Sequence, residues 1–407
     1  MNVLVLNCGS SSLKYRLIAM PAEKELASGE AQRVGPPTAE PARICHRVAG
    51  TEQVVEVDMP NHATAFDQIT KLLTQVDGLT PDVLGHRFVH GGNRFRRSVI
   101  IDGDTMEGLL AVKDMAPLHN PPTIGLIEAC RQSYPDMPQV AVFDTAFHST
   151  IPSYASTYAL PERVRNDLGI RKYGFHGTSH QYVAMEAAKY LGKPLRQLNA
   201  VSCHLGSGGA SLCAIVRGRS VDNTMGYSPL QGLIMSTRCG DLDPAVTLQL
   251  LHDHGTDPDA VEKVLNQRSG VLSLSGTSAD IRDVLAGMSS GGKDQERLQT
   301  TADLYLWRIR KYLGAYLAAV DKPDAVIFTD TIGETMPAVR YALCADMEWF
   351  GLHLDPRRNA SPGKLPTDIS ADSSPVRVLV IQTNEELAIA RQTYAVLRVS
   401  SKALVRS

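Results

Sequence analysis

The sequence predicts an α/β protein built from two similar domains. Short apolar runs of strand length alternate with amphipathic helical stretches along the chain, which is the pattern of an α/β fold. A chain of 407 residues is too long for one typical core and suits two domains. A strand–turn–strand pattern with small residues in its turn also occurs once in each half of the chain. This repetition predicts a duplicated domain.

The first hairpin pattern opens the chain. An apolar run ends at Asn7, the small residues 9–12 follow, and apolar and more polar positions then alternate up to Met20. Glycine lets a backbone come close to a ligand, and serine hydroxyls and backbone N–H groups can converge on an anion. Because Lys14 adds positive charge just beyond the turn, we predict a hairpin that grips phosphate; an ordinary Gly/Ser turn is the alternative.

The second hairpin pattern lies about two hundred residues later. Residues 200–204 form an apolar strand, residues 206–209 a turn of small residues, and residues 212–216 a second strand. A further turn at Arg217-Gly218 leads into residues 220–223. A third strand with a glycine near its end, residues 325–334, follows a long helical pattern.

The remaining elements are predicted from apolar spacing and from breaker residues. Residues 23–59 read as short strands with Gly/Pro turns, and one helix follows the pair Pro121-Pro122. Thr383 and Glu386 have the spacing of a capping box and predict the start of the final helix, which runs to about residue 397. The other predicted helices span residues 62–76, 107–115, 123–134, 179–190, 244–254 and 298–320, and the other strands residues 83–89, 140–143 and 376–381.

The composition excludes several classes of protein. A formal net charge of −2 and a pI of about 6.6 create no global field for nucleic acid or an anionic membrane. No apolar run is long enough for a bilayer span, and the N-terminus lacks the basic segment of a signal peptide. The seven cysteines have no C-x-x-C spacing, which argues against a disulfide framework or a zinc ribbon and indicates a reducing cytoplasm.

Eight segments of the chain together resemble the acetate kinases of the acetokinase family. They occur in one order from the first residue to about Ala395, so the resemblance covers nearly the whole chain. It implies the fold of acetate and sugar kinases, actin and the heat-shock ATPases, in which two ribonuclease-H-like domains bind nucleotide in the cleft between them. The segments are Asn7–Lys14, Gly85–Gly92, Ala116–Pro121, Phe143–His148, Tyr173–His180, Cys203–Gly206, Thr237–Pro244 and Thr383–Leu387.

The resemblance also implies domain boundaries and partners. The N-terminal domain comprises residues 1–148 plus 385–407, including a returning C-terminal helix. Residues 149–384 form the domain that binds nucleotide and dimerises. The resemblance implies a homodimer, and nothing in the sequence predicts binding to nucleic acid or to a membrane.

The implied reaction is the reversible transfer of a phosphoryl group from ATP to acetate, which gives acetyl phosphate and ADP. Mg²⁺, for which Mn²⁺ can substitute, is the implied cofactor, and its site contains Asn7 and Glu385. Oxygen ligands suit this ion. The catalytic residues implied by the resemblance are Arg87, Asp144, His176 and Arg238, of which His176 and Arg238 stabilise the transition state; Arg87 also binds acetate with Val89, Leu118, Phe175 and Pro229.

The roles of three of these side chains also follow from chemistry. A guanidinium can hold a carboxylate or phosphoryl group through two hydrogen bonds, which lysine cannot, and this suits Arg87 and Arg238. The family assigns Asp144 to proton transfer. A carboxylic acid has a pKa of roughly 4 to 5, so acetate arrives ionised and needs no base. We therefore expect Asp144 to orient an arginine or a metal-bound water.

The resemblance implies a nucleotide site with several departures from the family pattern. Ser207 replaces an asparagine, Asp330 and Thr331 replace two glycines, Thr335 replaces an asparagine, and Ser236 replaces a glycine. Residues with a Cβ atom narrow a loop that glycine leaves open, and a carboxylate repels polyphosphate unless it binds ribose hydroxyls or metal. The implied residues are Ser10, Ser12, Lys14, His204, Leu205, Gly206, Ser207, Gly208, Asp280, Ile281, Arg282, Thr331, Ile332, Gly333, Glu334 and Thr335.

These departures leave two alternatives beside an ATP-dependent acetate kinase. One is a carboxylate kinase that uses pyrophosphate or another donor without adenosine. The other is a non-catalytic nucleotide-binding switch, which the complete set of acceptor residues argues against. Because a small apolar pocket discriminates one methylene by only about 1–3 kcal/mol, we expect propionate to be a poorer substrate than acetate.

For His119 and His204, which match two further histidines of the family, we expect structural hydrogen bonds rather than a role in the chemistry.

Overall fold

The computed structural model describes residues 1–9, 11–36, 39–253, 257–288 and 294–404. Two positions named in the sequence-based predictions, Ser10 and the helix end at His254, lie outside these residues. The chain divides into two compact units: unit 1 comprises Met1–Ala146 with Asn384–Ser407, and unit 2 comprises Phe147–Thr383.

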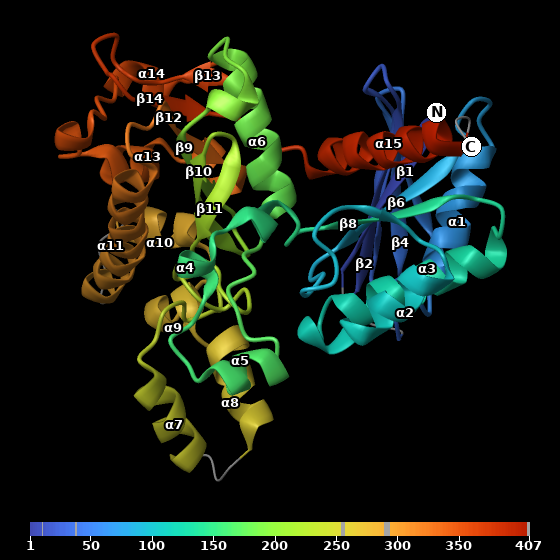
Figure 1. The fold of residues 1–407 in the computed structure, drawn as a ribbon, viewed down its shortest axis with the longest axis horizontal. Helices are drawn as coiled ribbons and strands as arrows, with labels where there is room; N and C mark the ends of the chain where they lie inside the picture. Colours follow the sequence, from blue (N-terminus) through green and yellow to red (C-terminus); the bar gives the residue numbers. More distant parts are fainter. Residues whose placement is uncertain (10, 37–38, 254–256, 289–293, 405–407) are drawn as a thin grey trace. The chain divides into compact units, whose positions relative to one another are not determined.

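Unit 1 contains an eight-stranded sheet in the order β5-β4-β3-β2-β1-β6-β8-β7 (Figure 1). Strands β1 to β5 form an antiparallel meander, β6 and β8 continue the sheet parallel to β1, and β7 pairs antiparallel with β8. The strands are β1 Asn2–Cys8, β2 Ser12–Ala19, β3 Lys24–Gln32, β4 Arg43–Val48, β5 Thr51–Glu56, β6 Val83–Phe88, β7 Val99–Ile100 and β8 Gln139–Phe143. The helices are α1 His62–Thr74, α2 Gly103–Ala111, α3 Asn120–Ser133 and α15 Glu385–Leu404, with a 3₁₀ turn at Lys113–Met115.

Both faces of the centre of this sheet are buried. Leu4 and Leu6 of β1 pack in a cluster with residues of α1 and α3, whereas Val3 and Val5 pack on the other face with Ile389 of α15. Successive strand residues point to opposite faces, so an unbroken apolar run such as that of β1 suits a strand covered on both sides. This burial fixes the position of the carboxyl end of β1, where Asn7 lies.

Unit 2 contains a six-stranded sheet in the order β11-β10-β9-β12-β14-β13. Its strands are β9 Ala200–Leu205, β10 Ala210–Val216, β11 Arg219–Asn223, β12 Ala325–Thr329, β13 Thr367–Asp368 and β14 Arg377–Val380. The α-helices are α4 Ser153–Ser156, α5 Glu162–Asp167, α6 Gly177–Tyr190, α7 Pro244–Asp253, α8 Pro258–Gln267, α9 Gly270–Ser275, α10 Ile281–Met288, α11 Gln295–Val320, α12 Asp330–Thr335, α13 Pro337–Cys344 and α14 Pro356–Ala360. The 3₁₀ helices are Phe147–Thr150, Leu195–Gln197 and Glu348–Phe350.

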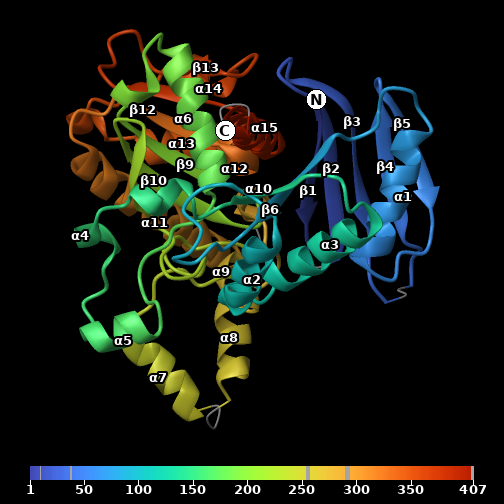
Figure 2. The same ribbon diagram turned by 45° about the vertical axis from the view of Figure 1, so that its right-hand side comes forward.

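The two sheets share one arrangement of strands. In each, an antiparallel meander of three strands (β1–β3 and β9–β11) joins two further parallel strands (β6 and β8, β12 and β14). In unit 2, α6 lies on one face of the sheet and α11 on the other (Figure 1), while Figure 2 shows α7 and α8 together at one end of the unit. The shared strand order confirms the predicted duplicated α/β fold.

The structure confirms both predicted hairpins. Strands β1 and β2 pair from Cys8 with Leu13, and β9 and β10 pair from Leu205 with Ala210. The turn after β10 places Arg217 and Gly218 at φ values of 52° and 71°, the left-handed pair of a type I′ turn.

Three local predictions are wrong. Residues 330–335 form the short helix α12 rather than a loop, because Glu334 accepts a hydrogen bond from the backbone N–H of Asp330 and so closes a helical turn. The N-cap of α15 is Asn384 rather than Thr383, since the Asn384 side chain accepts from the N–H of Leu387. Helix α3 begins at Asn120, so the two prolines lie in its first turn, where a missing N–H costs nothing.

Two expectations about covalent and membrane chemistry are also tested. All seven cysteines are free thiols, and five of them, Cys8, Cys130, Cys203, Cys213 and Cys344, are buried as core residues. Within the described part of the chain, no helix combines the length and apolar character that crossing a bilayer requires.

Candidate active site

A first group of predicted site residues meets at the carboxyl ends of β1, β6 and β8 in unit 1. Arg87 of β6 donates to one carboxylate oxygen of Asp144, from Nε at 3.0 Å and from Nη2 at 2.7 Å. Its Nη1 lies 3.3 Å from Oδ1 of Asn7 and 3.8 Å from Oε2 of Glu385. Because parallel strands end at the same edge of a sheet, residues far apart in sequence meet there.

The charges in this group are strongly coupled. Burial by itself lowers the pKa of Arg87, but the negative charges of Asp144 and Glu385 outweigh burial and raise that pKa above its usual value. The guanidinium is therefore cationic at every pH at which the protein is folded. The Asp144 carboxylate is 1% exposed and holds the guanidinium in one orientation.

This group fits a divalent cation of the magnesium type. Two carboxylates and one amide oxygen face a single guanidinium, so the charged groups carry an excess negative charge. Among the described residues, no three His, Cys, Asp or Glu side chains form a complete metal-binding cluster. An ion at Asn7 and Glu385 would therefore complete its shell with water and phosphate oxygens, as Mg²⁺ commonly does.

The β1–β2 turn lies next to this group. Lys14 is exposed and pairs directly across the sheet from Asn7, so both side chains lie on the same face. In the turn, the N–H of Gly9 donates to the carbonyl of Ser12 at 2.9 Å. A Cβ atom on Gly9 would lie 2.8 Å from the Ser12 hydroxyl, so a larger residue there would require that hydroxyl to rotate.

A second group of predicted residues meets in unit 2 around the β9–β10 turn. His176 precedes α6 in a left-handed conformation, with φ of 56°, and its ring lies 4.3 Å from that of His204 of β9. A Cβ atom on Gly209 would lie 3.5 Å from Nη1 of Arg238 and from the His176 ring. Two predicted phosphoryl-binding side chains therefore lie beside one backbone segment. Burial lowers the pKa of Arg238.

The helix α12 closes the other side of this turn. His204 contacts Asp330, with Nε2 and Oδ2 3.0 Å apart, and a Cβ atom on Gly206 would lie 2.3 Å from the same carboxylate oxygen. Burial raises the pKa of Asp330, but the hydrogen bond and charge of His204 outweigh it and hold the pKa below its usual range. An ionised carboxylate therefore lies directly against the turn predicted to bind phosphate.

The polar side chains of α12 that we predicted to bind nucleotide already make hydrogen bonds within the protein. Glu334 accepts from the N–H groups of Asp330 and Thr383 at 2.8 and 3.0 Å, and burial raises its pKa. The Thr335 hydroxyl donates to the carbonyl of Thr331 at 2.6 Å. The side chains of Leu205, Ile281 and Ile332 are core residues, so only their backbones are available to a ligand.

Asp280 and Arg282, two further residues of the predicted nucleotide site, form an ion pair with each other. Asp280 accepts from Nε and Nη2 of Arg282 at 3.0 and 2.5 Å, and these hydrogen bonds lower the pKa of Asp280. Ser207 and Gly208 lie in the β9–β10 turn, where the hydroxyl of Ser236 donates to the Gly208 carbonyl at 3.0 Å.

The four predicted residues of the acetate pocket are divided between the units. Val89 and Leu118 belong to unit 1, where Leu118 is 56% exposed, while Phe175 and Pro229 belong to unit 2, where Phe175 is buried.

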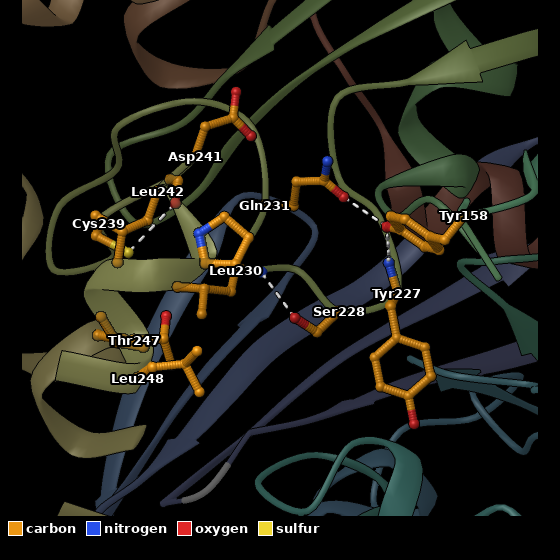
Figure 3. Close-up of a pocket in the computed structure, with 13 residues that line it drawn as sticks. Tyr158, Tyr227, Ser228, Leu230, Gln231, Cys239, Asp241, Leu242, Thr247 and Leu248 are labelled. Carbon is orange, nitrogen blue, oxygen red and sulfur yellow. Dashed lines mark hydrogen bonds between the residues drawn. The ribbon is translucent and has the colours of Figure 1, made fainter. Parts of the chain in front are cut away.

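A separate cavity of about 510 Å³ lies in unit 2, and the sequence did not predict it (Figure 3). Tyr158 donates to Gln231 at 2.6 Å and accepts from the N–H of Tyr227 at 3.0 Å along its wall. Asp241, also in the wall, accepts from Tyr312 at 2.6 Å and from the N–H of Gly232 at 3.0 Å. These hydrogen bonds hold both ends of the segment 231–241, which carries Arg238.

Arg340 is a residue that sequence reasoning missed. It is 0% exposed and donates to the carbonyls of Gly333 and Glu334 at 2.8 and 2.9 Å, and to Asn359 at 2.9 Å. Burial lowers its pKa to about 10. The guanidinium satisfies the last carbonyls of α12 and so holds this helix in place. An arginine in a short helical pattern carries no sequence signal for such burial.

Fold and sites together define a phosphotransferase: two α/β units of one strand order, each with a small-residue turn beside an arginine and further polar groups. Comparison with known proteins identifies the family of phosphotransferases. The model of the acetokinase family matches residues 2–391, and the chain belongs to this family.

Similar proteins cover almost the whole chain. Acetate kinase from Alkaliphilus metalliredigens is 45% identical over 404 residues, which is 98% of this chain and 100% of that protein. The Acetivibrio thermocellus acetate kinase is 46% identical over 405 residues, with the same coverage. The solved structure of Porphyromonas gingivalis acetate kinase has a TM-score of 0.89 and 38% identity over 97% of this chain and 99% of that one. A Francisella tularensis propionate kinase has a TM-score of 0.89 and 35% identity over the same shares.

Proposed function

We propose that this protein is an acetate kinase that transfers the γ-phosphoryl group of ATP to acetate in a magnesium-dependent, reversible reaction. The observation that carries this proposal is 45% identity to an acetate kinase over 98% of the chain. The group formed by Arg87, Asp144, Asn7 and Glu385 supports it with suitable chemistry. The pyrophosphate-dependent and non-catalytic alternatives are not favoured by these relatives.

The acceptor chemistry follows from the charges of unit 1. A carboxylate oxygen of acetate attacks the γ-phosphorus, and the bond from this phosphorus to the bridging oxygen of ADP breaks. No base is required, because acetate is ionised near neutral pH. Arg87 holds the acetate carboxylate, and Asp144 fixes the plane of that guanidinium through two hydrogen bonds to one oxygen.

The transferring phosphoryl group is stabilised by the side chains of unit 2. Arg238 and His176 approach the same glycine turn and donate to the equatorial oxygens, where charge is spread in the transition state. Asn7 and Glu385 contribute to the metal site. Mg²⁺ held there would supply positive charge that neutralises the phosphate oxygens.

We further propose that the protein is cytoplasmic and that it is a homodimer whose contact lies in unit 2; the family resemblance implies the dimer. Sedimentation velocity at several protein concentrations tests the oligomeric state. A species of one chain at all concentrations would contradict it.

The direct test is the formation of acetyl phosphate from acetate, trapped as acetyl hydroxamate by hydroxylamine. ATP, GTP and pyrophosphate are supplied in parallel, each with Mg²⁺, and propionate replaces acetate in a second series. We expect product with ATP and acetate, and a lower kcat/KM with propionate.

Three outcomes distinguish the readings. Product with pyrophosphate but not ATP would support the alternative donor and contradict the ATP site proposed here. A folded protein that forms no hydroxamate with any donor would contradict the enzyme itself. Loss of product when EDTA is added, and its return with excess Mg²⁺, supports the metal requirement.

A further inference from the structure

Polar side chains are buried on the face of the unit 2 sheet that α6 covers. Ser202 of β9 and Ser211 of β10 are both 0% exposed, as is His180 of α6. A buried hydroxyl or imidazole is costly unless it is hydrogen-bonded. Three such groups buried together therefore call for an explanation.

These three residues form a continuous chain of hydrogen bonds that ends on His176. The Ser202 hydroxyl lies 2.9 Å from Nδ1 of His180, and Nε2 of His180 lies 2.8 Å from the Ser211 hydroxyl. The same Ser211 hydroxyl lies 2.9 Å from Nδ1 of His176. His176 immediately precedes α6 and His180 lies in its first turn, and both rings reach the Ser211 hydroxyl of the sheet.

The number of available protons limits the directions that the hydrogen bonds of this series can take. Burial, with the charges of His148 and His204, holds the pKa of His180 well below its usual value, so His180 is neutral and carries one N–H. Ser211 also has one proton but contacts two rings, so it donates to one ring and accepts from the other. The three hydrogen bonds must therefore all run in the same direction.

Burial of Ser202 selects the direction. If the bonds run from Ser202 toward His176, each of the three protons is used: Ser202 donates to His180, His180 donates to Ser211, and Ser211 donates to His176. In the reverse direction Ser202 only accepts. Its hydroxyl proton would then lack an acceptor, since His180 is the partner of this hydroxyl among the described residues. A buried donor without an acceptor is disfavoured.

We infer that Ser202, His180 and Ser211 are positioning residues that hold His176 in the neutral tautomer with its proton on Nε2. This inference rests on the proposed function, in which His176 donates to the transferring phosphoryl group. Because Ser211 donates to Nδ1, Nε2 presents an N–H to phosphoryl oxygens. The opposite tautomer would present a lone pair, which repels those oxygens.

The first test reads the tautomer in the intact protein. In ¹⁵N-histidine-labelled wild type near neutral pH, the Nδ1 and Nε2 shifts of His176 are measured, with a His176→Gln variant for assignment. We expect Nε2 to be protonated and Nδ1 to be a hydrogen-bonded acceptor. In Ser211→Ala, the Nδ1 shift moves toward that of a free acceptor, and the second tautomer becomes populated.

The second test measures rate. Ser211→Ala is expected to lower kcat by about 10- to 100-fold, the range found when a group that orients a functional histidine is removed. The KM values for acetate and ATP stay near those of wild type, because the chain acts on the transferring group. Ser211→Thr keeps the hydroxyl and restores most of the rate.

The matched control is Ser374→Ala. The Ser374 hydroxyl is also buried in unit 2 and donates to the carbonyl of Val376 at 2.6 Å, but it is outside the hydrogen-bond chain that reaches His176. It is expected to keep kcat and the His176 tautomer. Equal losses of kcat in both variants would overturn the inference, because the effect would then be one of folding.

The tautomer measurement decides the matter even if a variant does not fold. A wild-type His176 protonated on Nδ1 alone would overturn the inference. A wild type with Nε2 protonated that forms no acetyl phosphate would support the hydrogen-bond direction and contradict the proposed function instead, so the two failures are distinguishable.

Discussion

Arg87 depends on side chains from three separate parts of unit 1. Asp144 follows β8, Asn7 lies near the end of β1, and Glu385 begins α15. The residue types could be predicted from the motifs that carry them. The contacts that each of these side chains makes could not be predicted. A sequence does not show that one oxygen of Asp144 accepts two hydrogen bonds from the same guanidinium.

Replacing Arg87 by lysine tests this geometry. Lysine keeps the charge but cannot make the two hydrogen bonds to Asp144 that fix the guanidinium, so we expect kcat/KM for acetate to fall by about 100- to 1000-fold. Steady-state kinetics with saturating ATP provides the measurement.

Arg391→Lys is the control for that change. Arg391 also holds a carboxylate through two hydrogen bonds, to Glu23 at 2.7 and 2.8 Å, in the same unit but on its surface. Its replacement is expected to leave kcat/KM unchanged. Near-wild-type activity of Arg87→Lys would show that charge alone is sufficient at this position.

At the scale of elements, α12 shows how one residue changes the surroundings of the turn that we predict to bind phosphate. Asp330 begins the helix with a φ of 64°, a conformation that glycine and asparagine adopt more readily than most residues. Its carboxylate contacts His204 and lies against Gly206. The sequence identified Asp330 as an unusual residue, but only the folded chain shows that it is paired with a histidine.

We expect Asp330→Asn and Asp330→Gly both to tighten ATP binding. Each removes a negative charge beside the turn and tolerates the positive φ, and a gain of about 10-fold corresponds to about 1.4 kcal/mol. Calorimetric titration with a non-hydrolysable ATP analogue and Mg²⁺ measures the dissociation constant. Weaker binding by both variants would instead indicate that the carboxylate accepts hydrogen bonds from ribose.

Buried histidines make the stability of the whole molecule depend on pH. His86 of β6 lies in the core of unit 1, where it contacts Gln139 at 2.8 Å, and burial lowers its pKa to about 4. The unfolded chain, with a histidine pKa near 6.5, binds more protons than the folded protein between these values. The stabilising contribution is therefore complete above pH 6.5 and is lost as the pH falls toward 4.

His86→Leu tests this linkage. The wild type is expected to lose about 3 kcal/mol of opening free energy across that pH window through this one group, at 1.36 kcal/mol per pH unit. The variant loses correspondingly less. Hydrogen exchange of the β6 amides, corrected for the intrinsic rate at each pH, gives the free energy of opening. Equal pH slopes in both proteins would contradict the assignment to His86.

The sequence by itself determined the α/β class, the duplication, both hairpins and the residue types of the site. These follow from local spacing: strands alternate with period two, helices with period 3.6, and small residues mark turns wherever they occur. The sequence also contained enough motif residues to indicate the family. Such features depend on neighbours along the chain, which the sequence displays directly.

Only the tertiary structure decided which side chains meet and in what order their hydrogen bonds run. The pair His204–Asp330, the bond from Arg340 to Asn359 and the hydrogen-bond chain from Ser202 to His176 join residues that are distant in sequence. Ser202 and Ser211 look like ordinary strand serines until α6 covers them. Their burial removes water as a partner, so the number of protons and acceptors on that face determines the tautomer we infer for His176.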